Sequence, residues 1–252
     1  MARTLASTLS DEQLGELLGL IGDADPVELK LTLPASDHRT AIGVLGIDPL
    51  DAQIRQVFFF DTPDLSLSKA GVVVRARRVQ GKGDDTVVKL RPVVPDQLSK
   101  KLRKTRGFGV EVDAMPGGYV CSASMKSTAN ADIRETLLEG RPLRKVFSKE
   151  QQAFFEGCAP DGIRLDDLSV LGPIFVLKLK FRPEDLPRRL VAEMWFYPDY
   201  TRILELSTKC APAEAFNAAA EVRVFLTEQG VDLSGDQETK TRKALEYFAN
   251  RD

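Results

Sequence analysis

The stretch VVVRARRVQGKGDDTVVKLR, residues 72–91, decides the fold. Charged and apolar residues alternate from Val72 to Val79 and again from Thr86 to Arg91, and the glycines and aspartates of residues 81–85 separate the two runs. Alternation with a period of two is typical of β-strands, because successive side chains point to opposite faces. A short connection rich in Gly and Asp favours a hairpin. The stretch therefore predicts two antiparallel strands with one apolar and one basic face.

Three further segments repeat this alternation: Glu28-Leu-Lys30, Lys178-Leu-Lys180 and Glu205-Leu-Ser207-Leu-Lys209. One interpretation is a solvated sheet face, since antiparallel sheets commonly keep one side in water. The other is a concave, basic, anion-binding surface, because rows of like charge on neighbouring strands destabilise a sheet unless something neutralises them. The alternation alone leaves both interpretations open.

Composition limits the class of protein. The chain has 252 residues, 43% of them hydrophobic, and a formal net charge of -2, which is ordinary for a soluble globular protein. We expect no duplex nucleic acid as partner, because such proteins are usually strongly basic, and any anion site must be a local concentration of charge. We find neither a membrane-length apolar run nor a signal peptide. Cys121, Cys158 and Cys210 lack CxxC spacing, so we expect reduced thiols and a cytoplasmic protein.

The order of predicted elements favours one domain. We expect helices over residues 10–22, 36–45, 129–139, 148–156, 213–229 and 237–249, and strands over 28–33, 53–60, 72–79, 86–91, 108–114, 163–168, 174–181, 190–197 and 201–209. Ser10 with Gln13, and Ser148 with Gln151, have the spacing of capping boxes. So many strands would leave exposed edges in an open sheet, so we predict a closed one.

Several motifs occur in a specific order along the chain: Phe59–Asp64, Leu67, Lys69–Gly71, Val74–Arg77, Val87–Arg91, Glu111–Asp113 and Ile203–Lys209. Together they resemble the CYTH family, also called triphosphate tunnel metalloenzymes, over most of the chain. The resemblance implies an α+β fold, namely a closed eight-stranded antiparallel β-barrel, the triphosphate tunnel, with flanking helices. It divides the single domain 1–252 into an N-terminal helical extension (1–25), the barrel with inserted helices (26–210) and C-terminal helices (211–252). It also implies hydrolysis or cyclisation of triphosphate substrates with a divalent metal.

The same resemblance assigns the site. A triphosphate is a dense polyanion, which Arg forks and Lys ammonium groups bind well. The expected phosphate-binding residues are Lys30, Arg75, Arg77, Lys89, Arg91, Arg144, Lys178, Lys180 and Lys209. The expected ligands for Mg²⁺ or Mn²⁺, both of which prefer oxygen donors, are Glu28, Glu111, Asp113, Glu193 and Glu205. Glu28 and Lys30 are the candidate catalytic residues.

One position departs from the family signature Glu-x-Glu-x-Lys. Here the segment is Pro26-Val-Glu28-Leu-Lys30, so a proline replaces the first glutamate. The loss leaves three alternatives: one metal site instead of two, a carboxylate supplied from elsewhere, or a barrel that binds an anion without hydrolysis. Lys178-Leu-Lys180 is a second departure, because many relatives carry carboxylates there.

The leading functional hypothesis is hydrolysis of inorganic triphosphate or of a nucleoside or other organic triphosphate. The alternatives are an adenylyl cyclase, which needs a purine pocket, and a non-catalytic module that binds polyphosphate or a phosphorylated ligand. We expect a small-molecule triphosphate or polyphosphate as partner, no membrane association, and C-terminal helices that cover the barrel or form a homodimer. His38, Asp61 and Asp64 are assigned to helix starts and turns, and Trp195 to packing.

Overall fold

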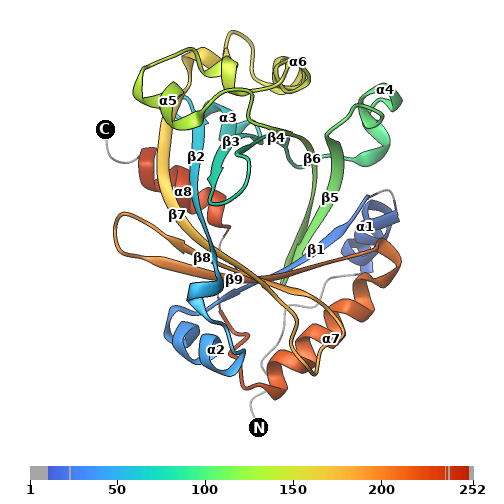
Figure 1. Cartoon of the computed structure of the whole chain (residues 1–252). Helices are drawn as coiled ribbons and strands as arrows, with labels where there is room; N and C mark the ends of the chain where they lie inside the picture. Colours follow the sequence, from blue (N-terminus) through green and yellow to red (C-terminus); the bar gives the residue numbers. More distant parts are fainter. Residues whose placement is uncertain (1–10, 23, 236, 238, 250–252) are drawn as a thin grey trace.

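The protein is described by a computed structural model that covers residues 11–22, 24–235, 237 and 239–249. Its centre is a closed β-barrel with the strand order β1-β5-β6-β4-β3-β2-β7-β8-β9 (Figure 1). The strands are β1 (Val27–Leu33), β2 (Gln53–Asp61), β3 (Val72–Val79), β4 (Asp85–Leu90), β5 (Phe108–Met115), β6 (Gly118–Thr128), β7 (Ser169–Phe181), β8 (Leu190–Phe196) and β9 (Arg202–Cys210). The closed barrel is confirmed, although it has nine strands instead of eight.

The strands themselves differ from the expected ranges at two segments. β6 was not predicted, because small residues such as Ser122 and Ser124 alternate there with Cys121 and Ala123, which gives only a weak hydrophobic period. The strand predicted over residues 163–168 is wrong. A 3₁₀ helix occupies Leu165–Asp167, and β7 starts only at Ser169.

The barrel is also not antiparallel throughout. β1 runs parallel to β5 over three residue pairs, Val27 with Val112, Glu28 with Asp113 and Leu29 with Ala114. All other neighbouring strands in the closed order are antiparallel. The parallel pair places acidic residues of two strands side by side on the inner wall.

Gly71 allows β3 and β4 to approach closely at the base of the hairpin of residues 72–91. Gly71 precedes β3 with φ of 77°, and a Cβ there would collide with the carbonyl oxygen of Arg91. The Arg91 amide donates to the Gly71 carbonyl at 2.9 Å. Only glycine combines this backbone conformation with this close approach, so it fixes the start of β3 against the end of β4.

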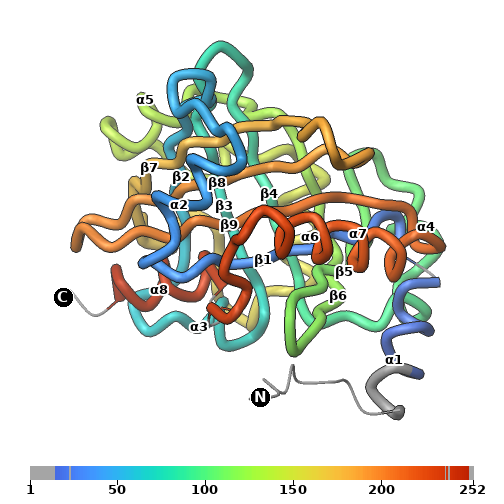
Figure 2. Tube along the Cα trace, turned by 90° about the horizontal axis from the view of Figure 1, so that it is seen from below, coloured from blue at the N-terminus to red at the C-terminus, as the bar shows by residue number. Residues whose placement is uncertain are grey.

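Eight α-helices lie outside the barrel wall or across its end in the described chain. They are α1 (Asp11–Gly22), α2 (His38–Val44), α3 (Ser66–Lys69), α4 (Lys100–Arg103), α5 (Ile133–Leu138), α6 (Lys149–Cys158), α7 (Ala215–Glu228) and α8 (Lys240–Ala249). α5 and α6 lie on the side of the barrel opposite α2 and α7 in Figure 1, and Figure 2 shows α7 along the wall that includes β1. None of the described helices is long and apolar enough to cross a membrane.

Helix α6 confirms the second capping box. The Ser148 side chain accepts from the Gln151 amide, and the Gln151 side chain accepts from the Ser148 amide. The Gln151 amide group also donates to the carbonyls of Thr86 and Met125, both at 3.0 Å. This buried glutamine therefore ties the helix start to β4 and β6. The first capping box includes Ser10 and lies outside the described residues.

Candidate functional site

The interior of the barrel changes character from one end to the other. Near the end of β2 and the start of β9 it is apolar, where Phe59 stacks on Trp195 with ring centroids 6.4 Å apart. Ala244 and Leu245 of α8 are buried in the same cluster. At the start of β1 and the end of β9 the interior is charged instead. The tunnel is therefore closed by a helix at one end and polar at the other.

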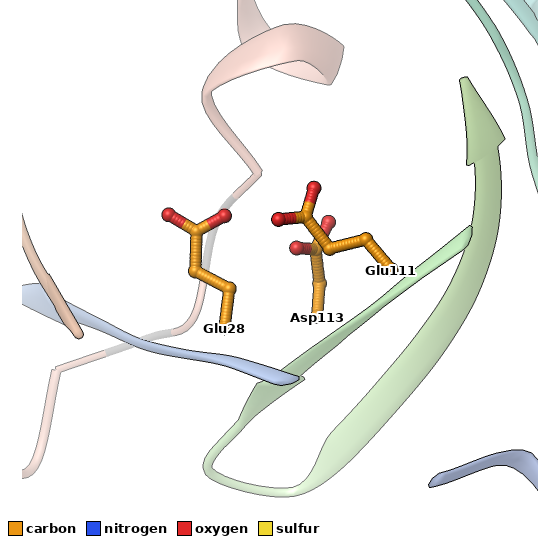
Figure 3. A group of neighbouring side chains, drawn as sticks. All are labelled: Glu28, Glu111 and Asp113. Atoms are coloured by element: carbon orange, nitrogen blue, oxygen red, sulfur yellow. The ribbon is translucent and has the colours of Figure 1, made fainter. Parts of the chain in front are cut away.

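Three carboxylates converge on the polar part of the wall, and we call Glu28, Glu111 and Asp113 the acidic triad. One oxygen of each lies within 4.8 Å of the others, and Figure 3 shows the side chains pointing toward one another. Glu28 lies beside Asp113 through the parallel β1–β5 pairing, while Glu111 precedes Asp113 by two residues and shares its face. Glu111 and Asp113 are buried and Glu28 is partly so.

Lysines of the barrel wall neutralise the triad. Lys30 Nζ lies 2.9 Å from Asp113 Oδ1, and Lys89 Nζ lies 3.2 Å from Asp113 Oδ2. Lys209 Nζ is 3.5 Å from Glu28 and forms a close ion pair with Glu111. Glu111 also pairs with Lys126 at 3.8 Å.

These ion pairs set the protonation of the triad. Burial alone would raise the pKa of Asp113, but Lys30 and Lys89 hold it well below its ordinary value. Glu111 behaves in the same way, because Lys126 and Lys209 outweigh its burial and lower its pKa. Burial opposes the charge on Lys30, yet Asp113 and Glu28 raise its pKa. At neutral pH Glu111 and Asp113 are ionised and Lys30 is a charged donor.

A second group of carboxylates lies on β8 and β9, and we call Glu193 and Glu205 the inner pair. They are direct neighbours across β8 and β9. Lys240 of α8 places its ammonium 2.5 Å from Glu193 Oε2 and 2.7 Å from Glu205 Oε1. Lys178 adds a 2.7 Å bond to Glu193 Oε1, and Trp195 Nε1 donates to Glu193 at 3.2 Å. The structure thus separates the five expected metal ligands into two groups, and among the described residues only the triad forms a three-carboxylate cluster.

A basic wall faces the acidic groups from β2, β3 and β7. Arg77 Nε bonds Asp85 Oδ1 at 2.8 Å, whereas the buried Nε of Arg75 has no hydrogen-bond partner among the described residues. Burial, with the neighbouring charge of Arg77, lowers the pKa of Arg75 to about 9, so the guanidinium stays charged at neutral pH. An unpartnered buried guanidinium nitrogen is a ready donor for an anion.

The other expected phosphate-binding residues divide into two sets. Lys89, Arg91 and Lys178 face the tunnel, and burial lowers the pKa of each. Lys180 is exposed at the end of β7. Arg144 is not brought together with them: it lies on the outer surface in the 3₁₀ helix Leu143–Val146, where its backbone amide and guanidinium both bond Asp166. The basic stretch before α6 therefore supports the outer layer and not the tunnel.

Four tunnel residues escaped the sequence reasoning. Arg55 lies on β2 opposite Val176, and its half-buried guanidinium bonds Gln53. Ser122 and Ser124 are buried, and neither hydroxyl has a hydrogen-bond partner among the described residues. Alternation on β2 could have identified Arg55, whereas the weak period of β6 gave no signal for the two serines. Lys240 had no such signal, because it reaches the tunnel from a helix.

The remaining single residues agree with their assignments. Asp61 accepts from the backbone amides of Thr62, Leu67 and Ser68, which stabilises the turn into α3. His38 begins α2 and contacts the Leu33 carbonyl at 3.2 Å, outside the tunnel. Neither side chain contributes to the triad.

The donor chemistry of the acidic triad fits a hard divalent cation. Mg²⁺ and Mn²⁺ take carboxylate oxygens and usually keep waters and bridge to substrate phosphates. Three carboxylates from two adjacent strands offer such oxygens, and lysines of the same wall surround them. The inner pair fits a cation less well, because Lys240 already contacts both of its members.

No protein-family model matches the chain, and no curated protein matches it in sequence. Solved structures do match. A Bacillus halodurans protein described as a candidate adenylate cyclase is 14% identical, with a TM-score of 0.57 over 85% of this chain and 95% of that one. A candidate adenylyl cyclase of Hippeastrum, described as having a dominant triphosphatase activity, is 20% identical, with a TM-score of 0.57 over 87% and 95%. At these identities the likeness shows a shared fold, which agrees with the fold that the resemblance to the CYTH family implies.

Proposed function

We propose that this chain is a metal-dependent phosphohydrolase that cleaves a triphosphate inside the barrel, and that inorganic triphosphate is its simplest substrate. The observation that carries the proposal is the acidic triad facing a wall of buried Arg and Lys residues in one tunnel. Carboxylates without the basic wall would suit a structural cation, and the basic wall alone would suit a simple anion site. Their combination suits a metal-bound polyphosphate. The triphosphatase described for the Hippeastrum structure, which has the same fold, agrees with this choice.

The residues would act by exchanging partners. When a triphosphate enters, Lys30, Lys89 and Lys209 would leave the triad for phosphate oxygens, and Arg75 would donate its unpartnered Nε. The triad would hold Mg²⁺ or Mn²⁺, which would polarise the phosphate oxygens. Because Lys30 stays protonated, it acts as a charged donor and not as a base. Glu28 is the most accessible member of the triad and is placed to orient a water.

The proline at position 26 is compatible with this scheme. Pro26 lies directly before β1 and two residues before Glu28, and its carbonyl accepts from the Val112 amide of β5 at 3.2 Å. A glutamate in this extended position would have faced the tunnel as well. Glu111 and Asp113 on β5 supply carboxylates beside Glu28 instead. Of the three alternatives left by the sequence, the geometry supports a carboxylate supplied from elsewhere.

The alternatives receive less support. A cyclase needs a surface for a purine, but Phe59 and Trp195 are stacked on each other and are only 0% and 4% exposed. A binding module without chemistry remains the second candidate, and Pro26 is the observation that favours it. Cytoplasmic location, a single domain and a homodimer stay predictions of the sequence.

Phosphate release from inorganic triphosphate, ATP and long-chain polyphosphate tests the proposal, each measured with Mg²⁺, with Mn²⁺ and with a chelator. We expect metal-dependent release that is fastest from inorganic triphosphate. Tight binding of triphosphate without turnover would favour the module, and formation of cyclic AMP from ATP would favour the cyclase.

A further inference from the structure

The inner pair poses an electrostatic problem that the strands solve only in part: Lys178 of β7 bonds Glu193 at 2.7 Å, but no strand lysine of the described chain forms an ion pair with Glu205. Glu193 and Glu205 lie directly opposite each other on β8 and β9, and both point into the barrel. Their side chains are only 13% and 9% exposed. Like charges in such a cross-strand pair destabilise a sheet, and burial makes the repulsion stronger. A cation that contacts both carboxylates therefore relieves the repulsion between them.

Lys240 supplies that cation. Its ammonium lies 2.5 Å from one carboxylate and 2.7 Å from the other, and its side chain is 12% exposed. The same ammonium lies 5.0 Å from the centre of the Trp195 ring, which adds a cation–π contact. Tyr197 donates its hydroxyl to the Lys240 carbonyl at 3.0 Å, which fixes the start of α8.

The ammonium of Lys240 keeps its charge despite its burial. Burial opposes it, but Glu193 and Glu205 raise the pKa of Lys240 above its ordinary value. Burial likewise opposes ionisation of Glu193, whose pKa Lys240 and Lys178 hold well below normal. Two carboxylates that share one centred cation have the arrangement of ligands around a metal ion.

From these contacts we propose that Lys240 replaces a metal ion at the inner pair, so that its ammonium occupies a latent second divalent-cation site. The place has room for an ion with waters, because a cavity of about 60 Å³ lies beside Lys240 and is also lined by Lys30, Asp113 and Glu205. Removal of the ammonium leaves two buried carboxylates with only Lys178, bonded to Glu193, as a close cation among the described residues, so the pair takes up a proton or binds a further cation. Mn²⁺, which accepts carboxylate and water ligands together, fills this site in a Lys240→Ala variant.

Counting bound Mn²⁺ per full-length chain, by calorimetry and by electron paramagnetic resonance, tests the proposal. Lys240→Ala should bind one more ion than the unchanged protein, and Lys240→Ala/Glu205→Gln should lose that extra ion. Lys240→Arg keeps the cation and should leave the number unchanged. Lys243→Ala, one turn further along α8, is the matched control and should also leave it unchanged.

The count separates this proposal from the proposed function. If the acidic triad binds Mn²⁺, the numbers for the unchanged protein, Lys240→Ala and the double variant are one, two and one. If the triad binds none, they are zero, one and zero, and the latent site stands while the proposed metal-dependent function fails. A Lys240→Ala protein that is folded by circular dichroism but gains no ion would overturn the proposal.

A further variant keeps the proposal testable if Lys240→Ala does not fold. Glu205→Gln in the otherwise unchanged protein should bind as many Mn²⁺ ions as the unchanged protein, because Lys240 already excludes metal from the pair. Loss of an ion in Glu205→Gln would show that the inner pair binds metal beside Lys240, which contradicts the proposal.

Discussion

The acidic triad and the inner pair are both carboxylate groups on the barrel wall, but they differ in what neutralises them. Around the triad, two of the lysines are half exposed: the side chains of Lys209 and Lys126 are 50% and 54% accessible. The inner pair is held by Lys240, which is 12% exposed and anchored from a helix. We infer that the exposure of a lysine and its anchoring decide whether a ligand can displace it from its carboxylate. The triad is built for exchange with a ligand, and the inner pair for permanence.

The largest expected difference between the acidic triad and the inner pair is in the rate of phosphate release. Glu111→Gln removes a charged oxygen from the triad, and we expect the rate of phosphate release to fall about 100-fold or more, since metal polarisation contributes several kcal/mol. Glu205→Gln changes only the partner of Lys240, so we expect a fall of about fivefold or less. Steady-state rates with saturating Mg²⁺ check both. Equal losses in the two variants would mean that the inner pair also binds the catalytic metal.

Binding should depend on the basic wall rather than on the outer surface. Arg75→Met removes the unpartnered guanidinium, and we expect the Kd for inorganic triphosphate to rise about 10- to 100-fold, because a charge-assisted hydrogen bond contributes about 1.5–3 kcal/mol. Arg144→Met is the matched control on the outer surface and should change the Kd by about twofold at most. Calorimetry with a chelator present, which isolates the protein contribution, measures both. Unchanged affinity in Arg75→Met would mean that inorganic triphosphate does not bind in the tunnel.

The free energy of unfolding should depend more on the inner pair than on the acidic triad, which is the opposite order to activity. We expect Lys240→Ala to lower the free energy of unfolding by about 3–5 kcal/mol, because it leaves buried carboxylates without their cation. Lys126→Ala removes an exposed partner of Glu111 and should cost about 1 kcal/mol or less. Urea unfolding in the presence of a chelator compares the two, and added Mn²⁺ should recover part of the loss only in Lys240→Ala. Comparable losses of unfolding free energy in Lys240→Ala and Lys126→Ala would show that the anchoring of Lys240 on α8 does not distinguish the inner pair from the acidic triad.

Lowering the pH should weaken the ion pairs of both the acidic triad and the inner pair, and we expect this to be the smallest of the four predicted effects. The folded pKa values of Glu111, Asp113 and Glu193 all lie below their ordinary values. The unfolded chain therefore takes up protons first, so the stability of these ion pairs is fully present above about pH 5 and is lost as the pH falls through about 4 and below. Asp113→Asn should unfold with a shallower dependence on pH over that range. An identical slope in the variant would mean that Asp113 is not ionised in the folded protein.

The fold followed from the sequence wherever alternation was strong. The hairpin of residues 72–91, the late strands and the capping box of Ser148 and Gln151 all depend on local spacing, and all are confirmed. β6 escaped because its inward positions carry small hydroxyl side chains in place of charges. The parallel β1–β5 pair could not be predicted, since register between strands distant in sequence depends on tertiary packing.

The site was predictable in its residue types but not in its grouping. All five expected carboxylates lie on the inner wall, because strand alternation fixes which face a side chain takes. Their division into triad and inner pair depends on Lys240, whose position results from the way α8 closes the barrel. Arg144 misled for the same reason: a basic residue in a loop carries no periodic signal, and here it bonds Asp166 outside the barrel.

The most direct test of the account is the release of phosphate from inorganic triphosphate by the unchanged protein, measured with Mg²⁺ or Mn²⁺ and again with excess chelator. We expect release with either metal and none with the chelator, and Glu111→Gln measured beside it should be nearly inactive. Equal release in the presence of the chelator, or full activity in Glu111→Gln, would contradict the assignment of the acidic triad as the metal site of a triphosphate-cleaving tunnel.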